Sequence, residues 1–208
     1  MTILETEMEL KQLVALPPWG RKQQDDWDKL SNNLVYGNLT YAVLQQELLK
    51  LGKGQDFDNY VINRWYNALS AFAVESLFSQ SPKVQANKNK YAKLVDFSID
   101  GIKFDHKTSV FPKGYGKTLA EAQKNPSDLI LWLYQQQSTQ GRYHTANRLF
   151  VLLYHSEGRA YDWQLRREFG LLQMAIQHYT ANFNPDNLKS VVVEQGKTTL
   201  SDIIWIVK

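Results

Sequence analysis

The 208-residue chain contains no cysteine. This absence excludes disulfides, thiolate zinc sites and cysteine nucleophiles, and it fits a reducing compartment better than secretion. Long apolar runs are missing too: none is longer than 129–134, which is far shorter than the roughly 20 residues that span a bilayer. The first residues are acidic and lack the basic start and apolar stretch of a signal peptide. We therefore expect a cytoplasmic protein with no membrane partner.

Spacing typical of zinc ligands is also absent, because the four histidines are scattered at positions 106, 144, 155 and 178. What is present is an ordinary globular composition, 43% hydrophobic and 22% charged, which argues against disorder. The net charge of +3 is unevenly distributed: residues 81–124 hold nine lysines and four acids, so they carry +5 and the rest −2. A basic segment suits a polyanionic partner, but a solvated lysine-rich surface would look the same.

The first 55 residues have the apolar spacing of short helices, over 5–16, 22–35 and 40–51, with Pro17-Pro18 and Gly52 as breaks. They predict an N-terminal helical extension, 1–55, which could serve as a cap, a dimerisation surface or a substrate clamp. Residues 56–208 then form the second predicted domain. A stronger helix over 59–79 opens it, with an apolar stripe along one side.

Two alternating runs, 94–99 and 102–110, are joined by Asp100-Gly101, the strongest short-range signal for a hairpin. Helices are expected over 118–124 and 127–137. The apolar run 129–134 also fits a buried strand, and we prefer the helix. Further strands are predicted at 149–155, 190–194 and 202–207, with a helix over 163–179. Strands interleaved with helices predict a mixed α/β domain.

A two-residue turn fixes which hairpin residues lie opposite each other. It pairs Ile99 with Ile102, Ser98 with Lys103, Phe97 with Phe104 and Asp96 with Asp105. The apolar face then includes His106, and the other face holds Asp96, Asp105 and Lys107, with the two carboxylate-bearing Cβ atoms about 5 Å apart. A one-residue bulge would move Asp96 to the other face.

Two carboxylates directly opposite each other destabilise a sheet unless a cation offsets them. Mg²⁺ does so well, because it is held by one or two carboxylates, waters and substrate phosphate. Lys107 beside it could stabilise developing charge or help activate water. The alternative is a solvent-facing strand pair whose acids are neutralised by Lys103 and Lys107, and these residues alone leave both interpretations open.

The run 95–109 resembles the active-site hairpin of the PD-(D/E)XK, or restriction-endonuclease-like, nuclease superfamily. Asp96 matches the first acid and Asp105-His106-Lys107 the second element, although Val95 replaces the proline of the motif. Glu75 matches a glutamate that the family commonly carries on the helix before the sheet. The resemblance implies an αβββαβ core with a mixed sheet flanked by helices. It also implies Asp96, Asp105, Lys107 and Glu75 as catalytic residues, and Asp96, Asp105 and Glu75 as ligands of Mg²⁺, with Mn²⁺ as a substitute.

The same resemblance implies an endonuclease that hydrolyses nucleic acid, in first place DNA, of the restriction, repair or mobile-element type. Such an enzyme could act as a homodimer, because cutting two strands favours two-fold symmetry. Basic residues that could contact the nucleic acid are Lys103, Lys113, Lys117, Arg142 and Arg148. The competing hypotheses are a non-catalytic nucleic-acid-binding or assembly subunit with the same fold, and an unrelated α/β protein with an accidental match.

Overall fold

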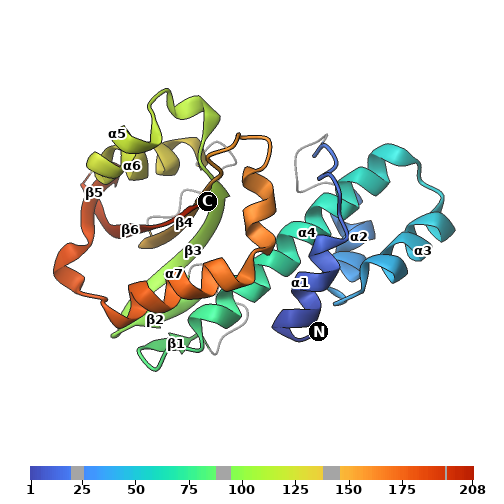
Figure 1. The fold of residues 1–208 in the computed structure, drawn as a ribbon, viewed down its shortest axis with the longest axis horizontal. Coiled ribbons are helices and arrows are strands. Elements are labelled where there is room, and N and C mark those ends of the chain that lie inside the picture. The colour runs from blue at the N-terminus through green and yellow to red at the C-terminus, as the bar shows by residue number, and fades with distance from the viewer. Residues whose placement is uncertain (20–25, 88–94, 138–145, 195) are drawn as a thin grey trace. The chain divides into compact units, whose positions relative to one another are not determined.

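The computed structural model describes residues 1–19, 26–87, 95–137, 146–194 and 196–208 (Figure 1). Contacts divide the chain into two compact units. Unit 1 comprises residues 1–76 and 167–169, and unit 2 comprises 77–166 and 170–208. The boundary falls inside one continuous helix, so the last residues of that helix belong to unit 2. A domain boundary after residue 55 stays a prediction.

Unit 1 is helical, as the sequence predicts. It contains α1 (Ile3–Lys11), α2 (Asp26–Tyr36), α3 (Tyr41–Leu51) and most of α4 (Gln55–Phe78). Local signals set the ends of α3: the Thr40 hydroxyl accepts from the amide of Val43, and Gly52 closes the helix in the left-handed conformation. Its core is aromatic, with Trp65, Tyr60 and Phe57 almost fully buried.

Unit 2 is built on a six-stranded mixed sheet with the order β1-β2-β3-β4-β6-β5. The strands are β1 (Val84–Ala86), β2 (Phe97–Ile99), β3 (Ile102–Val110), β4 (Arg148–Tyr154), β5 (Lys189–Glu194) and β6 (Lys197–Val207). The first three are antiparallel neighbours, β4 is parallel to both β3 and β6, and β5 pairs antiparallel with β6. The predicted α/β class with a mixed sheet is therefore confirmed.

Between β3 and β4 the chain forms η1 (Lys113–Tyr115), α5 (Leu119–Lys124) and α6 (Pro126–Gln137), so the apolar run 129–134 is helical as preferred. After β4 come η3 (Asp162–Arg167), α7 (Phe169–Ala181) and η4 (Pro185–Asn187). The single helix expected over 163–179 is thus interrupted at Glu168. The interruption coincides with Arg167, whose guanidinium donates to the carbonyls of Leu10 and Leu13 at the end of α1 within unit 1.

The two faces of the sheet are covered by different helices (Figure 1). On one face, α6 packs on β4 and β6 through a buried cluster that includes Leu129, Leu133, Phe150, Leu152 and Ile203. The neighbouring residue in β6, Asp202, points to the opposite face and accepts a hydrogen bond from Tyr179 of α7. Among the described residues, no helix is long and apolar enough to cross a membrane.

Candidate functional site

The β2–β3 hairpin has the predicted register but ends one pair early. The ladder contains Ile99–Ile102, Ser98–Lys103 and Phe97–Phe104. The next pair, Asp96 with Asp105, does not form: the Asp96 amide donates to the carbonyl of Phe104, and the Asp105 amide donates to Asn147 beside β4. This irregularity moves Asp96 out of line, so the expected opposition of the two carboxylates is absent.

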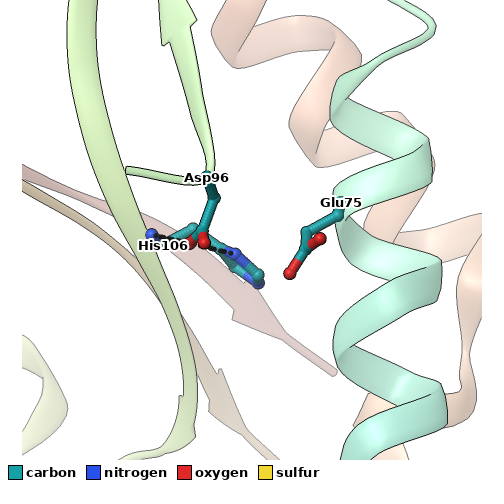
Figure 2. A group of neighbouring side chains, drawn as sticks. All are labelled: Glu75, Asp96 and His106. Carbon is teal, nitrogen blue, oxygen red and sulfur yellow. Dashed lines mark hydrogen bonds and ion pairs between the residues drawn. The ribbon is translucent and has the colours of Figure 1, made fainter. Parts of the chain in front are cut away.

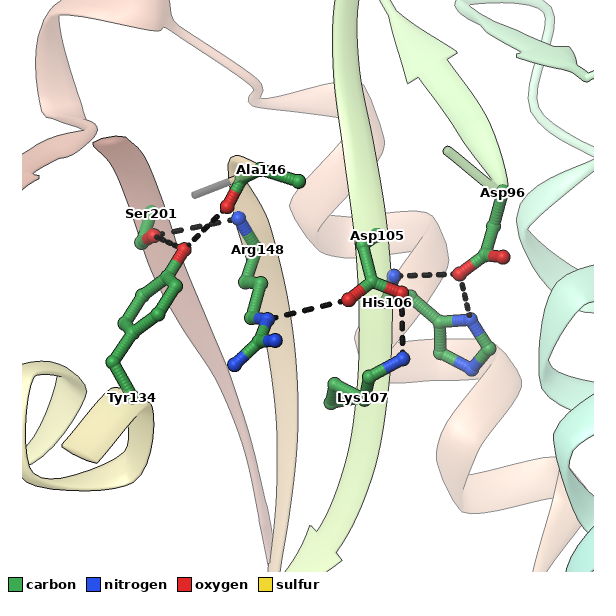
Figure 3. Close-up of polar contacts among 8 residues, drawn as sticks. All are labelled: Asp96, Asp105, His106, Lys107, Tyr134, Ala146, Arg148 and Ser201. Carbon is green, nitrogen blue, oxygen red and sulfur yellow. Dashed lines mark hydrogen bonds and ion pairs between the residues drawn. The ribbon is translucent and has the colours of Figure 1, made fainter. Parts of the chain in front are cut away.

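The Asp96 carboxylate instead binds His106 (Figure 3). Its Oδ2 accepts from the His106 amide at 2.7 Å and lies 3.2 Å from the ring Nδ1. Burial raises the pKa of Asp96, but the hydrogen bonds and charge of His106, with a smaller contribution from the Lys107 ammonium, outweigh it and lower the pKa overall. No hydrogen bond from a described residue reaches the other oxygen, Oδ1. Asp96 is therefore an anchored carboxylate with one oxygen available.

His106 lies on the apolar side of β3, as predicted, and only 5% of it is exposed. Its ring stacks on Phe97 and lies against Phe78, at 6.1 Å from each ring centre. When Nδ1 carries the proton and donates to Asp96, Nε2 holds a lone pair. That is the form in which imidazole binds metals, with the carboxylate fixing tautomer and orientation.

Glu75 lies in the last turn of α4, one turn before Phe78. Residues three apart share a helix face, and Phe78 stacks on Phe97 at 4.4 Å between ring centres. Helix continuity therefore turns Glu75 toward the His106 ring. One oxygen each of Glu75 and Asp96 and one ring nitrogen of His106 lie within 4.8 Å of one another (Figure 2). Two carboxylates and an imidazole are a donor set that suits a divalent transition metal or Mn²⁺.

Asp105 belongs to a different group of side chains, shown in Figure 3. Its Oδ1 accepts from the Lys107 ammonium at 2.5 Å and its Oδ2 from Arg148 Nε at 3.2 Å. Asp105 and Arg148 are both buried, whereas the Lys107 side chain is 42% exposed. Both carboxylate oxygens are thus occupied by cations, so Asp105 is placed to hold the two basic side chains rather than to present a vacant oxygen.

Arg148 is held in turn by aromatic and hydroxyl groups on the α6 side of the sheet. Its guanidinium lies 4.6 Å from the ring centre of Tyr134. The Tyr134 hydroxyl donates to the carbonyl of Ala146 at 2.7 Å and lies 2.9 Å from the Ser201 hydroxyl. This network makes Asp105 and Arg148 a rigid, desolvated pair at the start of β3 and β4.

The structure therefore divides the predicted catalytic residues into two groups. Asp105 and His106 are consecutive in β3, so their side chains point to opposite faces of the sheet. Asp105 pairs in register with Arg148, and His106 with Leu149. Asp96 and Glu75 accompany His106, while Lys107 accompanies Asp105. Lys107 couples the groups, because its charge contributes to the lowered pKa of Asp96.

The five predicted nucleic-acid contacts are not brought together. Arg142 lies outside the described residues. Arg148 is 4% exposed and binds Asp105, which removes it from the surface. Lys103 and Lys113 are exposed, but Lys103 is the second residue of β3, whereas Lys113 begins η1, beyond the other end of that strand. Lys117 is partly neutralised by Asp128, 2.7 Å away.

Three residues of the site are not among the site residues that the sequence predicts: His106, Tyr134 and Ser201. The sequence places His106 on the apolar face, and the signal that could have marked it is a titratable ring between two charged motif residues. Tyr134 and Ser201 carry no motif and are 67 positions apart, so only the packing of α6 on β6 brings them together.

Comparison with known proteins adds no relative. No family model matches the chain, and neither a curated protein nor a solved structure matches it at a significant level. The resemblance to PD-(D/E)XK nucleases therefore rests on the hairpin residues and on the order of the elements.

Proposed function

We propose that the protein is a divalent-metal-dependent nuclease with a restriction-endonuclease-like core. The order of elements supports this proposal: α4, the antiparallel strands β1, β2 and β3, the helices α5 and α6, then β4 parallel to β3. This is the αβββαβ order that the resemblance implies. Its substrate would be nucleic acid, DNA in first place, and a homodimer would provide one site for each strand.

The observation that carries the proposal is the state of Asp96. One of its oxygens is fixed by His106, and the other accepts no hydrogen bond from the described residues. The charge of the Lys107 ammonium contributes to the lowered pKa of Asp96. A carboxylate held in this way, with Glu75 and His106 nearby, fits a divalent cation as monodentate ligand. When bound, such a cation polarises a phosphoryl oxygen and lowers the pKa of water.

The remaining chemistry belongs to the side chains. Lys107 is the half-exposed cation of the site, and Asp105 fixes its ammonium in one position. There it can bind a non-bridging phosphate oxygen and stabilise the negative charge that develops during hydrolysis. Asp105 thus acts through Lys107, and Arg148 holds the Asp105 carboxylate in its orientation.

Cleavage of plasmid and single-stranded DNA with Mg²⁺ or Mn²⁺ tests this function. Asp96→Asn and Lys107→Ala should each lower kcat about 100-fold or more, because the first removes a ligand of the cation and the second removes the ammonium that would stabilise the phosphate charge. Lys103→Ala is the matched control for Lys107→Ala: it removes the same charge from an exposed position on the same strand. Asp186→Asn, in exposed η4, is the control for Asp96→Asn. Both controls should keep kcat.

Equal cleavage by wild type and the two site variants would contradict the assignment of these residues. A specific observation favours one other function, a nucleic-acid-binding subunit without catalysis: both oxygens of Asp105 are already engaged by cations. If the protein has that function, the wild type should bind DNA but should cleave none of the substrates with either metal.

A further inference from the structure

A cavity lies within unit 1, and none of the candidate site residues lines it. It has a volume of about 640 Å³ and is enclosed by α3, the first turns of α4 and the segment after α1. That volume is in the usual range for small-molecule sites. One of its lining residues, Leu49, is 80% exposed, so the cavity opens to solvent.

The lining combines an apolar floor with polar walls. Leu48 and Ile62 contribute apolar surface, whereas Gln45, Gln46 and Asn59 contribute side-chain amides. Of the described lining residues, Asp58 alone carries a charge at neutral pH, and none is a lysine, arginine or histidine. The cavity therefore has a single negative charge and several hydrogen-bond acceptors.

Asp58 differs from the other residues that line the cavity, because it combines a charge with an unpaired buried oxygen. Its Oδ1 is buried and has no hydrogen-bond partner among the described residues, and no ion pair to its carboxylate is found there. Burial without a partner raises the pKa of Asp58. A carboxylate that is partly desolvated and unpaired destabilises the fold, and an added cation with N–H donors would offset this.

We propose that this cavity binds a small organic cation, an alkylguanidinium or alkylammonium group on a short apolar body, with Asp58 as its counter-ion. The N–H groups of the cation would donate to the Asp58 carboxylate and the amide oxygens, and its apolar part would lie on Leu48 and Ile62. The same chemistry occurs in free amines and in the side chains of arginine and lysine. The site is independent of the proposed nuclease function.

The test is an NMR titration of the full-length protein with n-butylguanidinium and n-butylammonium, following the side-chain amide signals of Gln45 and Asn59. Neutral n-butylurea, of similar size, is the ligand control. We expect saturable shifts with a cation and weak or no binding of the urea. Asp58→Asn should weaken binding about 10- to 100-fold, the effect of losing a charge-assisted hydrogen bond.

Asp56→Asn is the matched protein control, because it removes an equal charge two residues away in α4 from an exposed side chain outside the cavity. Its affinity should stay within about twofold of wild type. Ala42→Phe, at an exposed lining position of α3, fills the cavity without changing charge and should also abolish binding. A capped Gly-Arg-Gly peptide distinguishes the two sources of the cation. If the peptide binds more tightly than n-butylguanidinium, the natural ligand is an arginine or lysine side chain of a protein partner. If it binds equally or more weakly, the natural ligand is a free amine.

The proposal fails if neither cation binds at millimolar concentration, if n-butylurea binds as tightly as the cations, or if Asp58→Asn binds like wild type. If Asp58→Asn fails to fold, Ala42→Phe still tests whether the cations bind in this cavity, because it leaves Asp58 intact. None of these outcomes depends on DNA cleavage.

Discussion

At the scale of single residues, the buried pair of Asp105 and Arg148 is the costliest arrangement in the site. Both side chains are about 95% buried. The cost of moving two charges out of water is offset only by good geometry and further contacts. Here Lys107 donates a hydrogen bond to Asp105, and the Tyr134 ring makes a cation–π contact with Arg148. The pair is therefore best understood as a device that orients Lys107, and its removal should be measurable.

Arg148→Met should destabilise the protein by about 3 kcal/mol, because it leaves the Asp105 carboxylate buried with only one cationic partner. Urea unfolding measures this loss. Lys117→Met is the comparison: it breaks an ion pair whose side chains are 48% and 38% exposed, and should change stability by less than about 1 kcal/mol. The double variant Arg148→Met/Asp105→Leu should recover most of the loss, since no buried charge remains unpaired. Equal effects of Arg148→Met and Lys117→Met would contradict this account.

Residue types and chain positions were readable from the sequence, but their final partners were not. The motif singled out Asp96, Asp105 and Lys107 because polar residues recur at a spacing of two around a turn. The backbone irregularity at Asp96 depends on a hydrogen bond from its amide to the Phe104 carbonyl. A hydrogen bond between backbone groups cannot be predicted from the types of the residues that make it. The burial of Arg148 was not predictable, because it depends on the pairing of β3 with β4, which η1, α5 and α6 separate in the sequence.

At the scale of elements, the turn between β2 and β3 sets the position of the whole site. Asp100 and Gly101 both have positive φ, 47° and 84°, as a type I′ turn requires. A Cβ added to Gly101 would meet no atom within 4 Å, so only the backbone conformation disfavours other residues at this position. This turn fixes the register that brings Phe97 opposite Phe104.

Gly101→Ala should therefore destabilise the protein by about 1 to 2 kcal/mol, the penalty for a left-handed non-glycine residue. Gly170→Ala is the matched substitution at an exposed position of α7, where a Cβ also meets nothing within 4 Å. There the same change should stabilise the protein by about 0.5 to 1 kcal/mol, because alanine favours the helix and restricts the unfolded chain. Thermal unfolding of the two variants checks the opposite signs, and a loss of stability in both would refute the conformational argument.

Most elements were predictable because their signals are local. Thr40 and Gly52 delimit α3, and Thr118 caps α5, whose glutamate at the third position completes a capping box. The interruption of the helix expected over 163–179 was not predictable, since the partners of Arg167 lie more than 150 positions away. Parallel pairing of β4 with β6 is likewise a long-range property that periodicity alone does not encode.

At the scale of the whole molecule, each unit has its own core. Leu44 of α3 is fully buried in unit 1, and Leu152 of β4 is 1% exposed in unit 2. Regions with separate cores can open separately, with free energies below that of global unfolding. The sequence placed a helical extension before a mixed α/β domain, but it could not show that α4 contributes to both units, because a helical pattern does not reveal which residues it will contact.

We expect the two units to lose structure as separate cooperative blocks. Leu44→Ala and Leu152→Ala remove similar apolar volume and should each destabilise their own unit by about 3 kcal/mol. In hydrogen-exchange mass spectrometry, Leu44→Ala should accelerate exchange in α2 and α3 while leaving β3, β4 and β6 unchanged. Leu152→Ala should show the converse pattern, with α2 and α3 still protected. If either variant accelerates exchange to the same extent in both sets of elements, the chain unfolds as one block, and α4 transmits the loss of one core to the other.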